Sequence, residues 1–271
     1  MSAPPGSSLQ ISVEEAVARL LAARVGGNLP EGGKHILIAC MPKSASTFLH
    51  QAIANIPGIV NVTLTVGYHR REQELCPLEC TLVHELDYVA AHHVRYSKAT
   101  DLLLRKFKIF PVILMRNVFD CIVSMREHLL NETLDIQQAY VPRQLSALPI
   151  EHQYDFIIDF VVPWYASFFA SWSEYEGNAV RLLYSNVIRD IPGTIAEILD
   201  AVGIKVSTAV VEHAISSVDP KQARFNVGKI GRGIEQLSEK QIGRIQSLFS
   251  YYSDISGVEN ILYPKSRSPG D

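Results

Sequence analysis

The stretch His35-Ile-Leu-Ile-Ala-Cys-Met-Pro-Lys-Ser-Ala-Ser-Thr-Phe48 decides the fold of this chain. Its first six residues are almost all apolar, which is typical of a strand buried on both faces. Residues 46–56 then return to helical spacing, so the stretch predicts a strand, a tight loop and a helix. Such a loop places backbone N–H groups, hydroxyl groups and the Lys43 ammonium at a helix N-terminus, where anions bind. The alternative is a helix N-cap formed by Ser44 or Ser46 beside a solvated lysine.

The same unit of a buried strand followed by a helix occurs twice more along the chain. The further apolar runs are residues 109–115 and 180–184, and the helices expected after them lie at about 119–130 and 194–202. This alternation predicts an α/β fold with a central parallel sheet flanked by helices. In such sheets ligands bind beyond the carboxyl ends of the strands, so we expect the functional residues in the loops that follow each strand.

A single domain is expected to account for nearly the whole chain, because neither an internal repeat nor a low-complexity linker divides it. Ser12 and Glu15 have the spacing of a capping box and begin an amphipathic helix that Gly26-Gly27 would end. We expect a flexible tail at residues 1–11, one domain at 12–262 and a second flexible tail at 263–271.

The composition is that of a globular chain. It has 271 residues, of which 47% are hydrophobic and 20% charged, and can bury a core without disulfides. Lys and Arg number 25 against 28 Asp and Glu, which leaves a net charge of −3. No basic field therefore favours nucleic acid or an anionic membrane surface, and any bound anion must be held locally.

Three features predict a cytoplasmic protein without a membrane span. The first ten residues contain neither a basic nor an apolar segment of the kind found in targeting peptides. The most apolar window, residues 156–172, is interrupted by Asp159 and Pro163 and is shorter than the roughly 20 residues that cross a bilayer. Four cysteines are too few for a disulfide framework and suit a reducing compartment.

The loop after the first strand lacks the spacing of a nucleoside triphosphate loop. That motif reads G-x-x-x-x-G-K-[ST], but Leu37 and Pro42 stand where its glycines belong ahead of Lys43. Phosphoryl transfer by a P-loop kinase would also need Mg²⁺ and a carboxylate ligand. A kinase is therefore a disfavoured alternative.

The loop instead resembles that of the sulfotransferases that use 3′-phosphoadenosine 5′-phosphosulfate (PAPS), which typically reads P-K-S-G-T-T-W. Here Ala45 replaces the glycine, which disfavours a strongly positive φ, and Phe48 replaces the tryptophan near the adenine. The resemblance implies a P-loop-like strand, loop and helix at the 5′-phosphosulfate site. The residues that it implies as contacts of PAPS here are Lys43, Ser44, Ala45, Ser46, Thr47 and Phe48.

A second motif of this family, a strand followed by R-N-P-x-D-x-x-x-S, is matched by Arg116-Asn117-Val118-Phe119-Asp120 and then Ser124. A guanidinium at a strand end can bind a phosphate through two hydrogen bonds, and a serine hydroxyl can add another. The resemblance implies that Arg116 and Ser124 bind the 3′-phosphate that separates PAPS from an ordinary nucleotide. The alternative is that Arg116 caps a helix through Asp120.

Three further segments extend the resemblance from about residue 36 to about residue 238. Residues 164–172 resemble the aromatic helix before the third strand of cytosolic sulfotransferases, and Tyr184 lies at the family's Y-E-D segment. Residues 224–233 resemble its R-K-G-x-x-G loop, with Asn226 and Val227 in place of the basic pair.

The resemblance implies a second set of PAPS contacts, which are Tyr184, Asn226, Val227, Gly228, Lys229 and Arg232. Which of Arg224, Lys229 and Arg232 contacts the 3′-phosphate is left open. A solvated surface turn is the alternative for the glycine-rich basic loop.

His93 is the residue that the resemblance implies as the general base. The base of this family ends a short strand upstream of the 3′-phosphate arginine, and His93 lies 23 residues before Arg116. Histidine is the usual side chain that accepts a proton near neutral pH. His92 would face the other side of the strand and is the second choice. The implied catalytic set is Lys43, His93 and Ser124.

We expect no metal. Cys76, Cys80 and His84 are spaced by four residues and would line one face of a helix, whereas a zinc ion needs ligands around it.

The sequence thus predicts a PAPS-dependent sulfotransferase that transfers a sulfuryl group to a hydroxyl or amine of a small-molecule acceptor. A non-catalytic nucleotide-binding domain of the same fold is an alternative beside the kinase. The sequence leaves open the acceptor and whether the protein is a homodimer.

Overall fold

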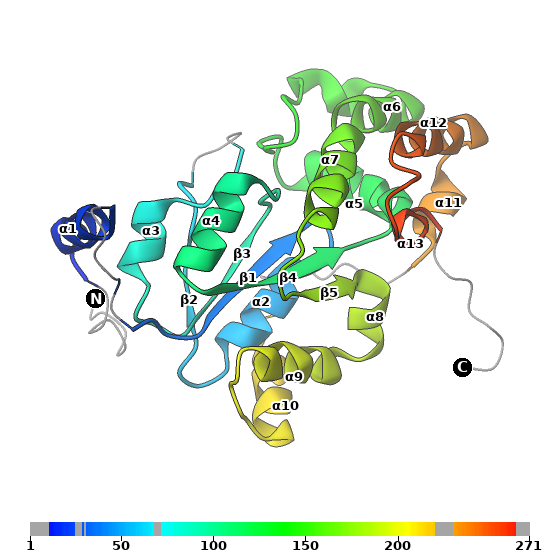
Figure 1. Ribbon diagram of the computed structural model, residues 1–271. Coiled ribbons are helices and arrows are strands. Elements are labelled where there is room, and N and C mark those ends of the chain that lie inside the picture. Colours follow the sequence, from blue (N-terminus) through cyan, green and yellow to red (C-terminus); the bar gives the residue numbers. More distant parts are fainter. Residues whose placement is uncertain (1–10, 25–28, 30, 68–71, 220–229, 264–271) are drawn as a thin grey trace.

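A five-stranded parallel sheet with helices on both faces forms the centre of the molecule (Figure 1). The computed structural model describes residues 11–24, 29, 31–67, 72–219 and 230–263. The strand order is β2-β3-β1-β4-β5, and every pair of neighbours is parallel. The strands are β1 (His35–Cys40), β2 (Val60–Asn61), β3 (Tyr88–His92), β4 (Ile109–Met115) and β5 (Val180–Leu183).

The helices fill the connections between these strands and the C-terminal part of the chain. Those up to β5 are α1 (Val13–Arg24), α2 (Ser46–Ala54), α3 (Pro77–Leu82), α4 (Lys98–Lys106), α5 (Val118–Asn131), α6 (Ile150–Phe160) and α7 (Val162–Ser173). Those after β5 are α8 (Tyr184–Arg189), α9 (Ile191–Ala201), α10 (Thr208–Ser216), α11 (Arg232–Gln236), α12 (Glu239–Ser250) and α13 (Val258–Leu262).

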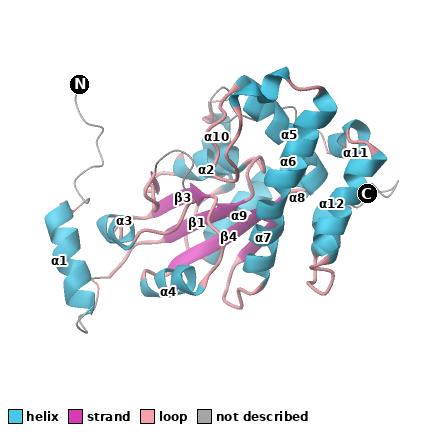
Figure 2. Cartoon of the chain, turned by 90° about the horizontal axis from the view of Figure 1, so that it is seen from above, coloured by secondary structure: helices cyan, strands magenta, loops and turns pink. Residues whose placement is uncertain are grey.

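Strand β1 is the central strand, and all six of its residues are buried. Because side chains alternate along a strand, Leu37 and Ala39 face one core while Ile36 and Ile38 face the other. The first core includes buried residues of α4 to α7 and α12, and the second includes residues of α2, α9 and α10. Figure 2 shows the strands enclosed by these helices.

The α/β fold with a parallel sheet, predicted from the alternating pattern, is confirmed. The predicted strands at 35–40 and 109–115 are found at the same residues, and the predicted N-terminal helix is α1. Its capping signal is real, because the Ser12 hydroxyl accepts a hydrogen bond from the Glu15 N–H at 3.1 Å. The predicted tails fall largely on residues 1–10 and 264–271, which lie outside the described residues.

The last predicted helix differs at its start. The structure begins α9 at Ile191, ahead of the expected 194, because the Asp190 carboxylate accepts the Gly193 N–H at 2.8 Å and Pro192 suits the first turn. A short helix, α8, occupies the segment after β5 where we expected a loop. Gly203 follows with φ of 75°, as expected of a glycine that ends a helix.

The segment Ile150–Ser173 is long and apolar enough to cross a membrane by length and composition alone, and its most apolar 18-residue window has a mean hydropathy of 1.2. It is longer than the window 156–172 considered in the sequence. In this fold the segment is two helices separated at Val161, and 56% of its most apolar window is buried. Tyr165, Phe168 and Trp172 are fully buried in the core, so this apolar segment belongs mainly to the interior of the protein.

Candidate active site

The loop between β1 and α2 has an unusual backbone. Both Lys43 and Ala45 adopt the left-handed region, with φ of 68° and 64°. Ala45 is the N-cap residue of α2, and no side chain caps the N–H groups of the first turn. The buried Ser44 hydroxyl instead donates to the Met41 carbonyl at 2.6 Å. The alternative of an N-cap by Ser44 or Ser46 is therefore wrong.

Arg116 lies directly after β4 and reaches back to this loop. Its Nη1 donates a hydrogen bond to the Lys43 carbonyl at 2.7 Å, and its guanidinium lies 4.2 Å from the centroid of the Tyr184 ring. The Nε atom of this 7% exposed arginine has no hydrogen-bond partner among the described residues. Because an unpaired buried donor is costly, this N–H fits a site for an acceptor such as a phosphate oxygen.

Asp120 does not pair with Arg116, so the alternative reading of Arg116 as a helix cap is wrong. The N-cap of α5 is Asn117, whose side chain accepts the Asp120 N–H at 3.2 Å. The Asp120 carboxylate accepts two other hydrogen bonds, from the N–H groups of Gly231 at 3.0 Å and Gly233 at 2.9 Å. A buried carboxylate on α5 thus holds the start of α11.

Ser124 lies one turn after Asp120 on α5 and is also buried. Residues 120, 124 and 127 are spaced by four and three, so they share the side of the helix that faces α11. Glu127 forms an ion pair with Arg232 there. Asn226, Val227, Gly228 and Lys229, predicted as PAPS contacts, lie outside the described residues.

His93 follows the last residue of β3, and its ring is fixed by the end of β1. Its Nδ1 lies 2.9 Å from the Cys40 carbonyl oxygen, which can only accept. Nδ1 therefore carries the proton, and Nε2 keeps the lone pair that can accept one. Burial lowers the pKa of His93 to about 4, and the nearby charges of Lys43 and His128 act in the same direction. The ring is neutral at pH 7.

His92 points into the protein and has a structural role. Its Nε2 accepts the Leu64 N–H at 2.9 Å, and the side chain is almost fully buried. Burial lowers the pKa of His92 to about 3. Of the two adjacent histidines, His93 is the one placed beside Cys40, Lys43 and His128.

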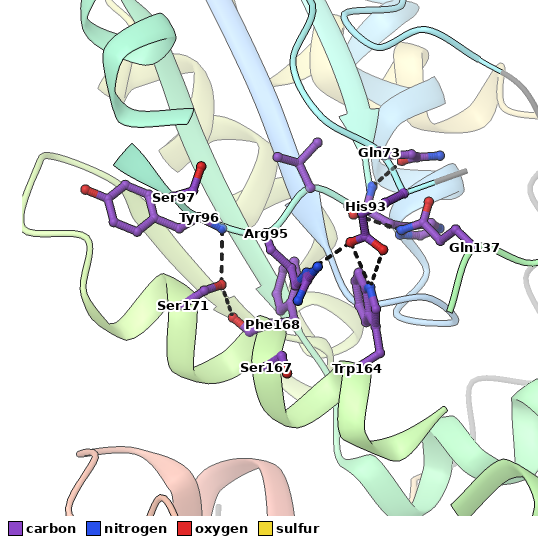
Figure 3. Close-up of polar contacts among 12 residues, drawn as sticks. Gln73, His93, Arg95, Tyr96, Ser97, Gln137, Trp164, Ser167, Phe168 and Ser171 are labelled. Carbon is purple, nitrogen blue, oxygen red and sulfur yellow. Dashed lines mark hydrogen bonds and ion pairs between the residues drawn. The ribbon is translucent and has the colours of Figure 1, made fainter. Parts of the chain in front are cut away.

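Two glutamines that sequence reasoning missed hold the backbone of His93 (Figure 3). Gln73 accepts the His93 N–H at 2.6 Å, and Gln137 donates to the His93 carbonyl at 2.9 Å. They come from the segments before α3 and after α5, which the sequence left without a recognisable role. No local motif marks them, because only the folded chain brings them to residue 93.

The aromatic helix α7 supports the same segment. Trp164 donates to the Glu72 carboxylate at 3.0 Å, and its ring lies edge-on to His93 at 6.5 Å. Further along α7, the Trp172 indole donates to the Val94 carbonyl at 2.8 Å. The Ser171 hydroxyl accepts the Tyr96 N–H at 3.1 Å (Figure 3). These contacts fix where the chain leaves β3.

Within the described ranges, no group of three His, Cys, Asp or Glu side chains is arranged to hold a metal ion. Cys76 precedes α3, whose residues 77–82 span too few turns to carry Cys80 and His84 together with it on one helix.

Comparison with known proteins gives a result at the level of the fold. No protein-family model and no curated protein matches the sequence. Mouse sulfotransferase SULT7A1 complexed with PAP is similar in structure, with a TM-score of 0.62 and 16% identity over 90% of this chain and 92% of that chain. Retinol dehydratase in complex with androsterone and inactive cofactor PAP has a TM-score of 0.53 and 14% identity, over 89% and 84% of the two chains.

A second structure of retinol dehydratase, with retinol and PAP, has a TM-score of 0.53, 14% identity and 82% coverage of each chain. At these identities the likeness concerns the fold. The fold of this chain is therefore the sulfotransferase fold that the two motifs predicted.

Proposed function

We propose that this protein is a PAPS-dependent sulfotransferase. The observation that carries the proposal is the buried Arg116, whose unpaired Nε lies beside the loop of left-handed residues and the uncapped N-terminus of α2. Two neighbouring places therefore suit anions: the N-terminus of α2 after β1, and Arg116 after β4. PAPS carries two anionic groups, the 5′-phosphosulfate and the 3′-phosphate, and needs two such places.

The chain's own groups divide between these two anions. The N–H groups of residues 46–48 and the Lys43 ammonium suit the 5′-phosphosulfate, and Arg116 with Ser124 suits the 3′-phosphate. Tyr184 orients Arg116 through its ring. Residues 226–229 and Phe48 are proposed as additional contacts. Arg232 is paired with Glu127 on α5, so its contribution is to bring the 230–233 segment against that helix.

His93 is proposed to take the proton of the acceptor through Nε2 while Cys40 holds Nδ1. When bound, PAPS would supply the sulfuryl group: the sulfur bonds to the acceptor oxygen or nitrogen, its bond to the bridging oxygen of the 5′-phosphate breaks, and adenosine 3′,5′-bisphosphate leaves. In the protein without donor, burial and the Lys43 charge keep the pKa of His93 low, so the base is unprotonated at neutral pH. Neutralisation of Lys43 by an anionic donor raises that pKa and makes the ring a stronger base.

The acceptor is proposed to be a small molecule with a hydroxyl or amine. Retinol dehydratase, which is similar in fold, was crystallised with androsterone and with retinol, both of them small alcohols. We further propose a cytoplasmic protein that needs no metal. A homodimer is left as an expectation that size measurement in solution can test.

Nucleotide selectivity tests the proposal. Calorimetry should show at least tenfold tighter binding of adenosine 3′,5′-bisphosphate than of AMP, because charge-assisted contacts contribute about 1.5 to 3 kcal/mol each. Arg116→Ala should remove the preference, whereas Arg105→Ala, on the exposed side of α4, should retain it. Equal affinity of the wild type for the two nucleotides would overturn the proposal.

Transfer of radiolabelled sulfate from PAPS to a panel of alcohols and amines separates an enzyme from a non-catalytic nucleotide-binding domain. Lys43→Ala should reduce turnover far more than affinity, because an ammonium near the bridging oxygen stabilises charge that develops as the bond breaks. Nucleotide binding without any transfer would assign the non-catalytic alternative.

A further inference from the structure

A carboxylate that no motif includes lies beside Lys43. Oε1 of Glu132 is 3.8 Å from the Lys43 Nζ, and the two side chains are 33% and 14% exposed. Glu132 is the residue that directly follows α5. A negative charge at a helix C-terminus is unfavourable because it meets the negative end of the helix dipole. The helix therefore gives no reason for a carboxylate at position 132, and the reason must lie in the groups that Glu132 contacts.

Glu132 belongs to a small charged cluster around the proposed base. His128, one turn earlier on α5, has its Nδ1 3.1 Å from Oε2 of Glu132. Lys43 and His128 both lie close enough to His93 to influence its pKa, so the cluster adjoins the proposed base. Asp120, Ser124 and His128 on α5, followed by Glu132 directly after the helix, thus form a polar stripe from α11 to Lys43.

We propose that Glu132 restrains Lys43 in the donor-free protein and must release it when the donor binds. The inference rests on the proposed function of Lys43 as a ligand of the phosphosulfate. One ammonium cannot contact Glu132 and the phosphosulfate equally well, and a carboxylate this close also repels an incoming anion. Glu132 is therefore a positioning residue that lowers donor affinity and sets where the Lys43 ammonium lies before donor arrives.

The geometry suits a contact that can be broken. At 3.8 Å and with a third of the carboxylate exposed, the pair is a loose ion pair screened by solvent. Arg116, by contrast, holds the Lys43 backbone carbonyl through a short hydrogen bond at 2.7 Å. The backbone of residue 43 is thus anchored while its ammonium makes only a loose contact with Glu132, so that contact can break without rearrangement of the loop.

The first test measures the affinity of adenosine 3′,5′-bisphosphate by calorimetry. We expect Glu132→Gln to bind about five- to fifty-fold tighter than the wild type. Glu151→Gln, an exposed residue on α6, makes the same change of net charge and should stay within twofold. In a Lys43→Met background, Glu132→Gln should improve affinity by a clearly smaller factor than in the wild type, because the ion pair with Lys43 is gone and only the repulsion between the carboxylate and the anion remains. An equal improvement in both backgrounds would assign the effect to repulsion alone and overturn the restraint. Equal or weaker binding by Glu132→Gln, with a wild type that binds, overturns the restraint and leaves the proposed function intact.

The second test needs no nucleotide. Glu132 stabilises the Lys43 ammonium, so Glu132→Gln should increase the rate at which acetic anhydride acylates Lys43 at pH 8 by about three- to tenfold, measured by peptide mass spectrometry. Lys106 at the end of α4 is the internal reference. If neither protein binds nucleotide, the proposed function fails and this rate alone decides whether the pair restrains the lysine. An unchanged Lys43 rate overturns the inference in every case.

Discussion

At the scale of single residues, Ala45 adopts a backbone conformation that is unfavourable for alanine. It adopts φ of 64°, which glycine reaches without cost and other residues do not. Arg116 holds the neighbouring Lys43 carbonyl, which keeps the loop in this form. The expectation that alanine disfavours positive φ is physically sound, but the surrounding loop imposes the conformation.

Ala45→Gly should therefore stabilise the protein by about 0.5 to 1 kcal/mol in urea unfolding, because relief of left-handed strain exceeds the added entropy of the unfolded chain. Ala196→Gly, at an exposed site within α9, is the matched control and should destabilise by about 1 kcal/mol. Destabilisation by both changes would show that position 45 carries no strain.

The two adjacent histidines should separate by function. His93→Ala should reduce sulfuryl transfer by roughly 10²- to 10⁴-fold with little change in nucleotide affinity, because Nε2 is the proposed proton acceptor. His92→Ala should leave the buried Leu64 N–H without its acceptor and cost about 2 to 3 kcal/mol of stability. Single-turnover rates and urea unfolding on both variants test this assignment. A dead His92→Ala that is fully folded, beside an active His93→Ala, would move the base to His92.

At the scale of elements, α5 connects the proposed 3′-phosphate site to the C-terminal segment. Asp120 holds the N–H groups of Gly231 and Gly233. A Cβ added at Gly233 would lie 2.2 Å from the Phe119 backbone carbon, so only glycine allows this approach. Gly233 therefore serves close packing against α5, whereas Gly231 has open space around it and supplies a left-handed turn with φ of 89°.

Asp120→Ala should cost about 2 to 4 kcal/mol, since two N–H groups lose their acceptor. Amide hydrogen exchange should accelerate at residues 231–236, and nucleotide affinity should fall. Asp120→Asn, which keeps one acceptor oxygen, should be intermediate in all three measurements. Exchange at 231–236 that is unchanged in Asp120→Ala would show that other contacts hold α11.

Local sequence patterns were sufficient to predict strands and the loop residues that directly follow them. Buried apolar runs gave β1 and β4, and motif spacing identified Lys43 and Arg116, which the fold brings within one hydrogen bond of each other. Gln73, Gln137 and Glu132 could not be predicted, because segments without periodicity or motif carry them to the site through tertiary packing. The short α8 was missed because six residues give little periodicity.

At the scale of the whole molecule, the two faces of the sheet support different parts of the proposed active site. One core packs α4 to α7 and α12 against β1, β3 and β4, and the segments that hold His93 lie on that side. The other core includes buried residues of α2, whose uncapped N-terminus lies next to the loop that follows β1. The proposed base and the proposed anion site therefore rest on different layers that meet at the carboxyl end of β1.

Buried histidines make the stability of this fold depend on pH. Burial lowers the pKa values of His35 and His50, and lowers those of His92 and His93 to about 3 and about 4. Each of these groups binds a proton more readily in the unfolded chain, where its pKa is about 6.5. Stability is thus fully present above pH 6.5 and is lost as the pH falls from there toward the folded-state values.

For His92 and His93, whose folded-state pKa values lie well below this window, the expected loss approaches about 1.4 kcal/mol per pH unit each, so His92 alone should account for about 2 kcal/mol between pH 6.5 and 5. Urea unfolding at pH 7, 6 and 5 measures the slope. His92→Gln should reduce this slope by the contribution of one titrating histidine, about 1.4 kcal/mol per pH unit. The amide oxygen of glutamine can still accept the Leu64 N–H, but the amide does not titrate. Carboxylates contribute mainly below pH 5, so this window isolates the histidines. The prediction is wrong if the free energy of unfolding is constant from pH 7 to 5, or if His92→Gln leaves the slope unchanged. Either result would mean that His92 has the same pKa in the folded and the unfolded chain. The burial of the His92 ring and its hydrogen bond with the Leu64 N–H argue against equal pKa values.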